Sequence, residues 1–588
     1  MIYKELVAVY EQLEGTSKRL EKTWYIALLL KKTPLEDLEH LCLLLQGRLF
    51  PAYDEREVGV ASRLVIKALS LATGHSLDKV EQIWKKTGDL GKTAELLIAK
   101  KHQATLAQQH LTVRKVFENL RKLAELEGEG VVDRKLKLIA ELLTSASPLE
   151  SKYIIKTVLQ DLRIGVGEGV MRDAILWAFF TRELHILYDN RDNLEVVTEF
   201  DRKKYMEYAA SVQRMYDLSA NFGEVAAALK KKGKDAFGTI ELEVGKPLKV
   251  MLYQKAKDIK DAFETVGKPA AFEYKYDGFR MQIHKNDESI ELFTRRLERV
   301  TNQFPDVVKV VKAQIQSKAC ILDAEIIGID PKTRQWMPFQ NISQRIKRKY
   351  DIEETIRKIP VMVNVFDILY ADGKTLLHEP FSKRRALIER IVREKKDEIQ
   401  AARQIVTSSE KEAHAFYEES LKKGNEGVMA KSLDKEYKPG SRVGYGVKVK
   451  PVMETLDLVI VGAEWGEGKR SGWLSSFVLA CRDGIHFREI GRVGTGIKEL
   501  ESEGVTFEKL TKLLKPLIIE EKGKEVTVKP KIVLEIDYEE IQKSPTYGSG
   551  YALRFPRVLR LREDKSIRDA SEISYIKQIS PRASFARG

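Results

Sequence analysis

The chain has 588 residues, 43% of them hydrophobic and 32% charged, and its 101 Lys and Arg against 87 Asp and Glu leave a formal net charge of +14. At roughly 100–200 residues per domain, this length excludes a single compact domain and predicts about three to five. The hydrophobic fraction excludes a disordered chain. The longest apolar runs, residues 26–30 and 41–45, fall short of the ~18 residues that cross a bilayer, and no signal-peptide pattern opens the sequence. We therefore expect a cytoplasmic protein.

Cysteine usage and charge narrow the function further. Cys42, Cys320 and Cys481 are widely separated, so neither a disulfide framework nor a C-x-x-C zinc module can be formed, and any metal must bind to oxygen ligands. The positive excess favours a polyanionic partner such as nucleic acid, and hence a nucleoid-associated protein, because lysine and arginine side chains release counterions from phosphates. A solvated surface rich in salt bridges is the alternative explanation of the same totals.

The first ~240 residues have helical periodicity. Residues 33–36 (TPLE) predict a capping box with proline at the first helical position, and residues 147–150 (SPLE) repeat this start signal for a helix over about 148–162. That helix runs into RIGVGEG, where Gly165, Gly167 and Gly169 interrupt regular structure before another helical stretch from Val170. Exposed N–H groups beside a helix start can hold a phosphate, although an ordinary turn between helices is the alternative interpretation.

After the lysine-rich residues 230–234 the pattern changes to strands. Phe272, Tyr274 and Tyr276 alternate with polar residues, and residues 320–329 and 361–370 are further candidate strands. A helical stretch at about 382–394 lies between such segments, which is typical of an α+β or α/β domain. From about residue 450, short strands separated by glycine-rich turns predict a small barrel or sandwich of ~140 residues.

The sharpest local signal is EYKYDGFR, residues 273–280. On a strand, Glu273 and Lys275 project to the same side, and Gly278 lets the chain turn away. Aromatic neighbours and the nearby Arg280 predict a lowered pKa for Lys275, and a neutral amine is what nucleophilic catalysis requires. K-x-D-G alone is a weak motif, however, and an exposed lysine before a turn explains it equally well.

Further motifs follow in a fixed order: TRRLE (294–298), DAEIIG (323–328), VFDILY (365–370), EGVMAK (426–431), YKPGSR (437–442), KVK (448–450) and RFPRVLRLREDK (554–565). Together with KYDGFR, they resemble the ATP-dependent DNA ligases of the archaeal and eukaryotic type, within the covalent nucleotidyltransferase superfamily. RLEKT (19–23) and LQDLRIGVGEG (159–169) also resemble the helical DNA-binding region of these ligases. The resemblance therefore covers essentially the whole chain.

The resemblance implies a multidomain fold. Residues 1–240 would form an all-α DNA-binding domain, residues 241–449 an α+β nucleotidyltransferase (adenylation) domain, and residues 450–588 a C-terminal OB-fold β-barrel. It also implies sealing of nicks in duplex DNA, 3′-hydroxyl to 5′-phosphate, through a lysyl-AMP intermediate and adenylated DNA, in replication, repair and recombination. The expected cofactors are ATP and Mg²⁺ or Mn²⁺, and the expected state is a monomer.

The resemblance also implies a role for individual residues. Lys275 would be the nucleophile, Glu273 would contact the adenine amino group, and Phe366 would stack on the base, with a core aromatic as the alternative for the last. The other implied nucleotide contacts are Arg280, Arg295, Glu325, Arg442, Lys448 and Lys450; the metal ligands are Glu325 and Glu426, with Asp323 and Asp367 secondary; the DNA contacts are Arg163, Gly165, Gly167 and Gly169. In the C-terminal motif, Arg554, Arg557, Arg560 and Arg562 would help to orient the β and γ phosphates.

The sequence departs from the family pattern at several positions, and other functions remain as alternatives. Gly446 stands where the family commonly has tryptophan, and Lys249 and Val250 replace arginine and proline, so one wall of the nucleotide pocket is not defined by the resemblance. Residues 103–106 occupy the position of a sliding-clamp hook but lack its paired aromatics. RNA ligases and GTP-using capping enzymes are the nearest rivals, but they lack the ~240-residue helical module. A non-catalytic DNA-binding scaffold is the rival from another class, and the intact Lys275 and Glu426 disfavour it.

Overall fold

The computed structural model describes the whole chain except residues 55, 57, 101–109, 127, 129, 189–192, 197, 338, 347–350, 452–453, 467–469, 471, 500–503 and 581–588. It divides into two compact units, Met1–Lys450 and Pro451–Gly588. Within the described ranges, no helix combines the length and the apolar character that a membrane crossing requires. Cys42, Cys320 and Cys481 are buried free thiols.

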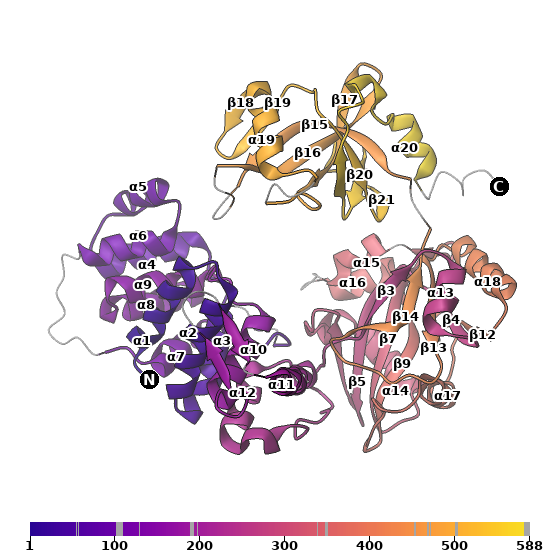
Figure 1. Cartoon of the computed structure of the whole chain (residues 1–588), viewed down its shortest axis with the longest axis horizontal. Helices are drawn as coiled ribbons and strands as arrows, with labels where there is room; N and C mark the ends of the chain where they lie inside the picture. The colour runs from indigo at the N-terminus through magenta and orange to yellow at the C-terminus, as the bar shows by residue number, and fades with distance from the viewer. Residues whose placement is uncertain are drawn as a thin grey trace. The chain divides into compact units, whose positions relative to one another are not determined.

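The N-terminal part of the first unit is helical, as expected (Figure 1). Apolar residues at helical spacing bury one continuous core there, which includes Leu6, Leu30, Leu69, Phe117 and Trp177. The helices are α1 Tyr3–Gly15, α2 Arg19–Lys32, η1 Leu35–Asp37, α3 Leu38–Leu45, α4 Ser62–Thr73, α5 Leu77–Thr87, α6 Leu90–Ala99, α7 Val113–Glu125, α8 Val131–Ser145, α9 Pro148–Val158, α10 Glu168–Phe180, α11 Glu199–Ser219, α12 Phe222–Lys232 and η2 Gly233–Ala236, with a hairpin of β1 Ile186–Tyr188 and β2 Leu194–Val196.

The two predicted capping boxes have different outcomes. Ser147 accepts the backbone N–H of Glu150 and the Glu150 side chain returns to Ser147, so the capping box at α9 is confirmed. The capping box predicted at Thr33 is wrong. The Thr33 hydroxyl instead donates to the Leu29 carbonyl at 2.7 Å, so it ends α2 rather than starting the next helix. The predicted helix over 148–162 also ends earlier, at Val158.

The central part of the first unit is α+β. Its elements are β3 Leu252–Ala256, α13 Ile259–Val266, β4 Ala270–Lys275, β5 Phe279–Asn286, β6 Ser289–Thr294, η3 Thr301–Gln303, α14 Pro305–Gln314, β7 Ala319–Ile329, β8 Trp336–Met337, α15 Phe339–Ile346, α16 Ile352–Lys358, β9 Val361–Ala371, β10 Lys374–Thr375, α17 Phe381–Ile391, β11 Ile399–Ala401, β12 Gln404–Thr407, α18 Glu410–Lys422, β13 Gly427–Ser432 and β14 Arg442–Val449.

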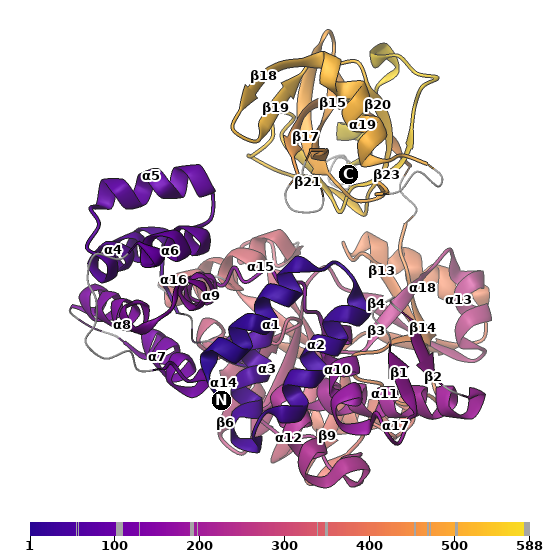
Figure 2. The same cartoon turned by 60° about the vertical axis from the view of Figure 1, so that its left-hand side comes forward.

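These strands form two sheets. One has the order β10-β9-β7-β5-β6, with β11 added to β9 and β8 to β7, and the other has the order β12-β4-β13-β14-β3. Phe263 of α13 and Phe416 of α18 pack with Phe272 and Val428 against one face of the second sheet, where Figure 2 shows both helices. The helices α14 and α17 bury Val307 and Ile388 in the core of the first sheet. On the opposite face of β7, the polar residues Asp323 and Glu325 lie between the apolar Ile321 and Ile327.

The second unit is rich in strands. Its elements are β15 Leu456–Trp465, β16 Leu474–Asp483, β17 His486–Val493, α19 Phe507–Leu514, η5 Lys515–Leu517, β18 Ile518–Lys522, β19 Glu525–Val528, β20 Val533–Asp537, β21 Glu540–Lys543, β22 Tyr551–Arg554, β23 Arg557–Leu561, η6 Ile567–Asp569 and α20 Ile573–Ile579. The long strand β15 pairs with β16, β19 and β20, and Leu458, Phe477 and Leu534 lie in the main core of this unit. The helical, α+β and strand-rich order expected from the sequence is therefore confirmed.

Candidate functional site

Lys275 is the last residue of β4, at the junction of the two sheets. Phe272 and Tyr274 pack into the apolar core behind the strand, so strand alternation turns Glu273 and Lys275 to the other face, as predicted. Gly278 follows, and a β-carbon there would lie 2.3 Å from the Ile326 carbonyl oxygen of β7. Only glycine permits this close approach, which brings the Lys275 turn against the strand that carries Glu325.

Glu426 lies between two lysines. Its Oε2 is 2.5 Å from Lys275 Nζ and 2.5 Å from Lys450 Nζ, and its backbone N–H donates to the Lys275 carbonyl at 2.8 Å. Burial acts to raise the pKa of Glu426, but the two ammonium groups outweigh it and lower that pKa to about 2. The carboxylate therefore stays ionised and holds both amines at one point.

Glu325 differs from Glu426 in that its pKa is raised and its side chain has no direct cationic partner among the described residues. It lies on β7 directly across from Arg280 of β5, is half-buried, and makes no side-chain hydrogen bond or ion pair with another described residue. Burial raises the pKa of Glu325 to about 8, helped by the negative charges of Glu426 and Asp277 and opposed by Lys275 and Arg280. A buried carboxyl without a direct partner beside a second carboxylate is suited to a cation.

Glu273 is held by side chains from neighbouring elements. Its carboxylate lies 2.6 Å from Lys431 Nζ of β13 and accepts the Gln404 amide of β12 at 2.9 Å. Arg385 of α17 is 3.8 Å away. The Glu273 side chain is 2% exposed, so these partners fix its position in a site almost closed to water.

Phe366 lies between two cations. The Arg280 guanidinium carbon is 5.2 Å from the ring centroid and Lys431 Nζ is 5.0 Å from it. Arg280 is itself committed: it donates to the Met251 carbonyl at 2.8 Å and the Tyr437 hydroxyl at 2.9 Å, and it pairs with Asp323. Two of its guanidinium nitrogens are therefore occupied by protein groups, so Arg280 supports Phe366 and Tyr437 in addition to any nucleotide contact.

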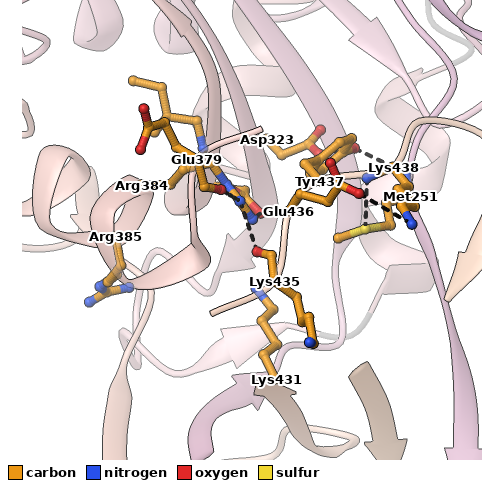
Figure 3. A network of polar contacts seen from close by, with 12 residues as sticks. Met251, Asp323, Glu379, Arg384, Arg385, Lys431, Lys435, Glu436, Tyr437 and Lys438 are labelled. Atoms are coloured by element: carbon orange, nitrogen blue, oxygen red, sulfur yellow. Dashed lines mark hydrogen bonds and ion pairs between the residues drawn. The ribbon is translucent and has the colours of Figure 1, made fainter. Parts of the chain in front are cut away.

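Tyr437 and Arg384 are the centres of a polar network (Figure 3). The buried Tyr437 hydroxyl donates to Asp323 at 2.7 Å and accepts the Met251 N–H at 3.0 Å. Arg384 forms two bonds to Asp367, at 2.7 and 3.1 Å. Asp323 and Asp367, the secondary metal candidates, thus have cationic partners. Among the described residues, no three His, Cys, Asp or Glu side chains form a metal-binding group.

The remaining predicted nucleotide contacts are on or beside β6 and β14. Lys448 is on β14 opposite Met429 of β13, Arg442 begins β14 and is exposed, and Arg295 is exposed just after β6. At Gly446, a β-carbon would lie 2.2 Å from Cε1 of Tyr253 on β3. The tyrosine ring therefore occupies the space beside the position where the resemblance leads us to expect tryptophan.

The glycine-rich loop before α10 has a basic lining. Lys22 of α2 donates to the Ile164 carbonyl at 2.5 Å, and a β-carbon at Gly169 would lie 3.1 Å from Arg19. Arg163 and Gly165 have positive φ of 48° and 69°. The proposed clamp segment at residues 103–106 lies outside the described residues.

The C-terminal motif forms β22, β23 and the residues after them in the second unit. Arg562 pairs with Asp457 at 3.1 Å and Asp564 at 2.8 Å, and Arg560 pairs with Glu535 at 2.5 Å. Arg554 pairs with Glu540 at 3.2 Å, and Arg557 is exposed. These arginines are thus partly committed to carboxylates within their own unit.

Sequence reasoning missed four residues of this site: Lys431, Gln404, Tyr437 and Tyr253. Lys431 and Tyr437 lie within the quoted motifs EGVMAK and YKPGSR, so a charged or hydroxyl-bearing residue in a motif was an available signal. Gln404 and Tyr253 had no such signal, because each reaches the site through strand pairing that the sequence does not state.

Comparison with known proteins agrees with this architecture. The model described as "ATP dependent DNA ligase domain" matches residues 250–450, "DNA ligase N terminus" matches 2–176, and "ATP dependent DNA ligase C terminal region" matches 470–565. The DNA ligase of Nanoarchaeum equitans is 47% identical over 583 residues, 98% of each chain, and that of Thermococcus onnurineus is 44% identical over 581 residues, also 98% of each. The solved structure "Pmar-Lig_Pre." has a TM-score of 0.54 at 16% identity, covering 95% of this chain and 99% of its own, which supports the fold.

A helical module, a two-sheet α+β body with a lysine at its junction and a strand-rich C-terminal unit define a ligase, an enzyme that joins two substrates at the expense of a nucleotide. The matches over the full length go further: the chain belongs to the family of ATP-dependent DNA ligases. Its function is the ATP-driven sealing of nicks in DNA.

Proposed function

We propose that Lys275 carries the nucleotide in this reaction. The observation that supports it is the position of its amine, 2.5 Å from the Glu426 carboxylate at the junction of the two sheets. Once deprotonated, Nζ attacks the α-phosphorus of ATP, a P–N bond forms, and the bond to the leaving pyrophosphate breaks. The amine must lose its proton before attack, and Glu426 orients the amine for this step.

Two further transfers complete the sealing of a nick. An oxygen of the DNA 5′-phosphate attacks the adenylate phosphorus, which releases Lys275. The 3′-hydroxyl then attacks the 5′-phosphate phosphorus, forms the phosphodiester and expels AMP. Arg295, Arg442, Lys448 and Lys450 would stabilise the negative charge that develops on phosphorus, since fixed cations in a closed site act strongly. Lys450 is already aligned with Lys275 through Glu426.

The base and ribose would lie against the two sheets. Glu273 would accept a hydrogen bond from the adenine amino group, and Phe366 would stack on the base. Arg280 would support the Phe366 ring and would contact ribose or phosphate through its remaining nitrogen. Glu325 would bind the ribose hydroxyl or a metal. The exposure of Arg295 and Arg442 supports roles at the phosphate end.

Glu325 and Glu426 would hold Mg²⁺ or Mn²⁺. Two neighbouring carboxylates, one of them without a direct partner among the described side chains, fit a hard cation that takes its other ligands from phosphate and water. When bound, such an ion supplies positive charge near the α-phosphate.

DNA would bind through phosphates at Arg163, Gly165, Gly167 and Gly169, supported by Lys22 and Arg19 beside the loop. We further propose that residues 1–240, 241–449 and 450–588 are the DNA-binding, adenylation and OB-fold domains, and that the enzyme is a monomer, cytoplasmic and nucleoid-associated. Binding of a sliding clamp through residues 103–106 belongs to the same proposal.

Covalent labelling tests the proposal. Incubation with [α-³²P]ATP and Mg²⁺ should label the protein, and Lys275→Ala should abolish the label and nick sealing while binding of nicked DNA and sealing of a pre-adenylated nick persist. Lys268→Ala is the control, because this exposed lysine pairs with Glu410 outside the site. Labelling of Lys275→Ala to the wild-type extent would contradict the proposal. Labelling by GTP, or preferred sealing of RNA, would favour the rival nucleotidyltransferases.

A further inference from the structure

The Glu273 carboxylate is placed by a frame of side chains rather than by its own strand alone. Gln404 of β12 is its direct partner across the pair β12–β4, and Nε2 of that glutamine donates to Oε1 at 2.9 Å. Lys431 of β13 approaches from the other neighbouring strand, with Nζ 2.6 Å from Oε2. Glu273 therefore has a hydrogen bond on one oxygen and an ion pair on the other, from the strands on both sides of β4, and the two contacts together hold the carboxylate in place.

The frame leaves the carboxylate able to accept but not to donate. An ionised carboxylate has about four acceptor positions, so positions remain open beside the Gln404 hydrogen bond and the Lys431 ion pair. At 2% exposure the side chain has almost no water to screen it. A ligand atom that meets the remaining positions must carry a hydrogen, and a carbonyl oxygen there would face the negative charge directly.

The Lys431 ammonium could in principle favour the opposite kind of ligand atom, a carbonyl oxygen, because an ammonium donates hydrogen bonds. Its Nζ is nevertheless committed: it lies against Glu273, 5.0 Å from the Phe366 ring centroid and 4.4 Å from that of Phe381, and its side chain is 4% exposed. The cation thus serves to hold Glu273 and to face two aromatic rings.

We propose that Lys431 and Gln404 are positioning residues that hold Glu273 so that the site prefers a 6-aminopurine nucleotide to a 6-oxopurine nucleotide. This inference rests on the proposed role of Glu273 toward the base. It assigns the selectivity of the site to side chains on β12 and β13 that need not touch the nucleotide themselves.

The test measures formation of the covalent nucleotidyl-enzyme with ATP and with ITP, which has oxygen in place of the 6-amino group. In Gln404→Leu we expect the KM for ATP to rise by about tenfold and the preference for ATP over ITP to fall by about tenfold, with kcat for adduct formation nearly unchanged, because a hydrogen bond to a charged group is lost. Lys431→Met should lower the preference more, and Lys431→Arg, which keeps the cation, should restore part of it.

Gln213→Leu is the matched control. Gln213 of α11 donates from Nε2 to Asp217 at 3.0 Å, which is the same amide-to-carboxylate bond at a site that takes no part in the proposal. It should leave the ratio of ATP to ITP at the wild-type value. Thermal melting of each variant reports whether it is folded.

The outcomes separate the two proposals. If wild type forms the adduct at Lys275 with ATP, but folded Gln404→Leu and Lys431→Met both keep the wild-type preference and KM, the inference is wrong and the proposed function stands. If wild type forms no adduct at Lys275, both are wrong. Should Lys431→Met fail to fold, Gln404→Leu alone still decides the question.

Discussion

Tyr253 and Gly446 share one space in the nucleotidyltransferase core. A β-carbon at position 446 would lie 2.2 Å from Cε1 and 2.4 Å from Cδ1 of the Tyr253 ring, closer than packed atoms approach. The strand β14 shifts register between Val443 and Val447, and this irregularity brings Gly446 against β3. The tyrosine ring thus keeps this position on the condition that residue 446 has no side chain.

This relationship predicts that Gly446→Ala lowers stability and adenylation together. Overpacking of a buried site costs about 1–3 kcal/mol, and displacement of Tyr253 disturbs the neighbouring strands. Thermal melting and labelling with [α-³²P]ATP measure the two effects. Gly444→Ala is the control in the same strand, because a β-carbon there meets nothing within 4 Å. Adding Tyr253→Leu to Gly446→Ala should recover part of the stability; equal melting of the Gly446→Ala and Gly444→Ala variants would refute the prediction.

The raised pKa of Glu325 predicts a pH-dependent stability. The folded pKa is about 8 against an ordinary 4.5, so between these values the unfolded chain has released a proton that the folded chain retains. The contribution of Glu325 to the free energy of unfolding is therefore fully present below about pH 4.5 and is lost as the pH rises to about 8. Glu325→Gln, which cannot ionise, should flatten this part of the melting-temperature profile. Glu418→Gln, at an exposed position of α18, should not.

The same carboxyl predicts proton release on metal binding. A cation favours the ionised form of Glu325, so Mg²⁺ that binds with ATP at about pH 7 must displace the proton that burial retains. Titration calorimetry in buffers of different ionisation enthalpy measures the number of protons released. Wild type should release more protons than Glu325→Gln. Identical release by the two proteins would show that the metal does not bind to Glu325.

The buried pair of Arg384 and Asp367 predicts a large loss of stability when one partner is removed. Both side chains are 1% exposed, so Arg384→Met leaves an uncompensated carboxylate in the core and should cost about 3–5 kcal/mol. The neighbouring Lys383→Met removes an exposed pair with Glu379 and should cost less than about 1 kcal/mol. Urea unfolding of the two variants, followed by far-ultraviolet circular dichroism, tests the contrast. Similar midpoints would contradict it.

The loop before α10 predicts a phosphate contact that does not depend on base sequence. Arg163→Ala should weaken binding of nicked duplexes of any sequence and reduce the slope of log K against log salt by about 1. Covalent labelling by ATP should be unchanged. Arg390→Ala, at an exposed position of α17, is the control. A variant with the wild-type salt slope would remove Arg163 from the DNA contacts.

Local patterns predicted the parts of this protein that local physics determines. The alternation around Lys275, the strand at residues 361–370 and the capping box at Ser147 follow from residues close in sequence, and the structure confirms them. Thr33 shows the limit of such local patterns, because its hydroxyl could end one helix or begin the next. In the structure it bonds to the Leu29 carbonyl and ends α2.

The partners of the site residues depend on register between distant strands. Gln404 reaches Glu273, and Lys450 reaches Glu426, only after β12, β4, β13 and β14 are aligned. The sequence placed Arg280 close to Lys275 along the chain, yet the group next to the Lys275 amine is the Glu426 carboxylate. Arg280 itself is turned toward Asp323 and Tyr437. Which cation meets which anion is a three-dimensional property that spacing along the chain does not contain.

The hydrogen bond from the Glu426 N–H to the Lys275 carbonyl lies one residue before β13, directly beside the ladder between β13 and β4. The backbone therefore ties the residue that carries the amine directly to the residue that carries its counterion. The proposed nucleophile and its carboxylate partner are thus joined twice, once through the main chain and once through their side chains.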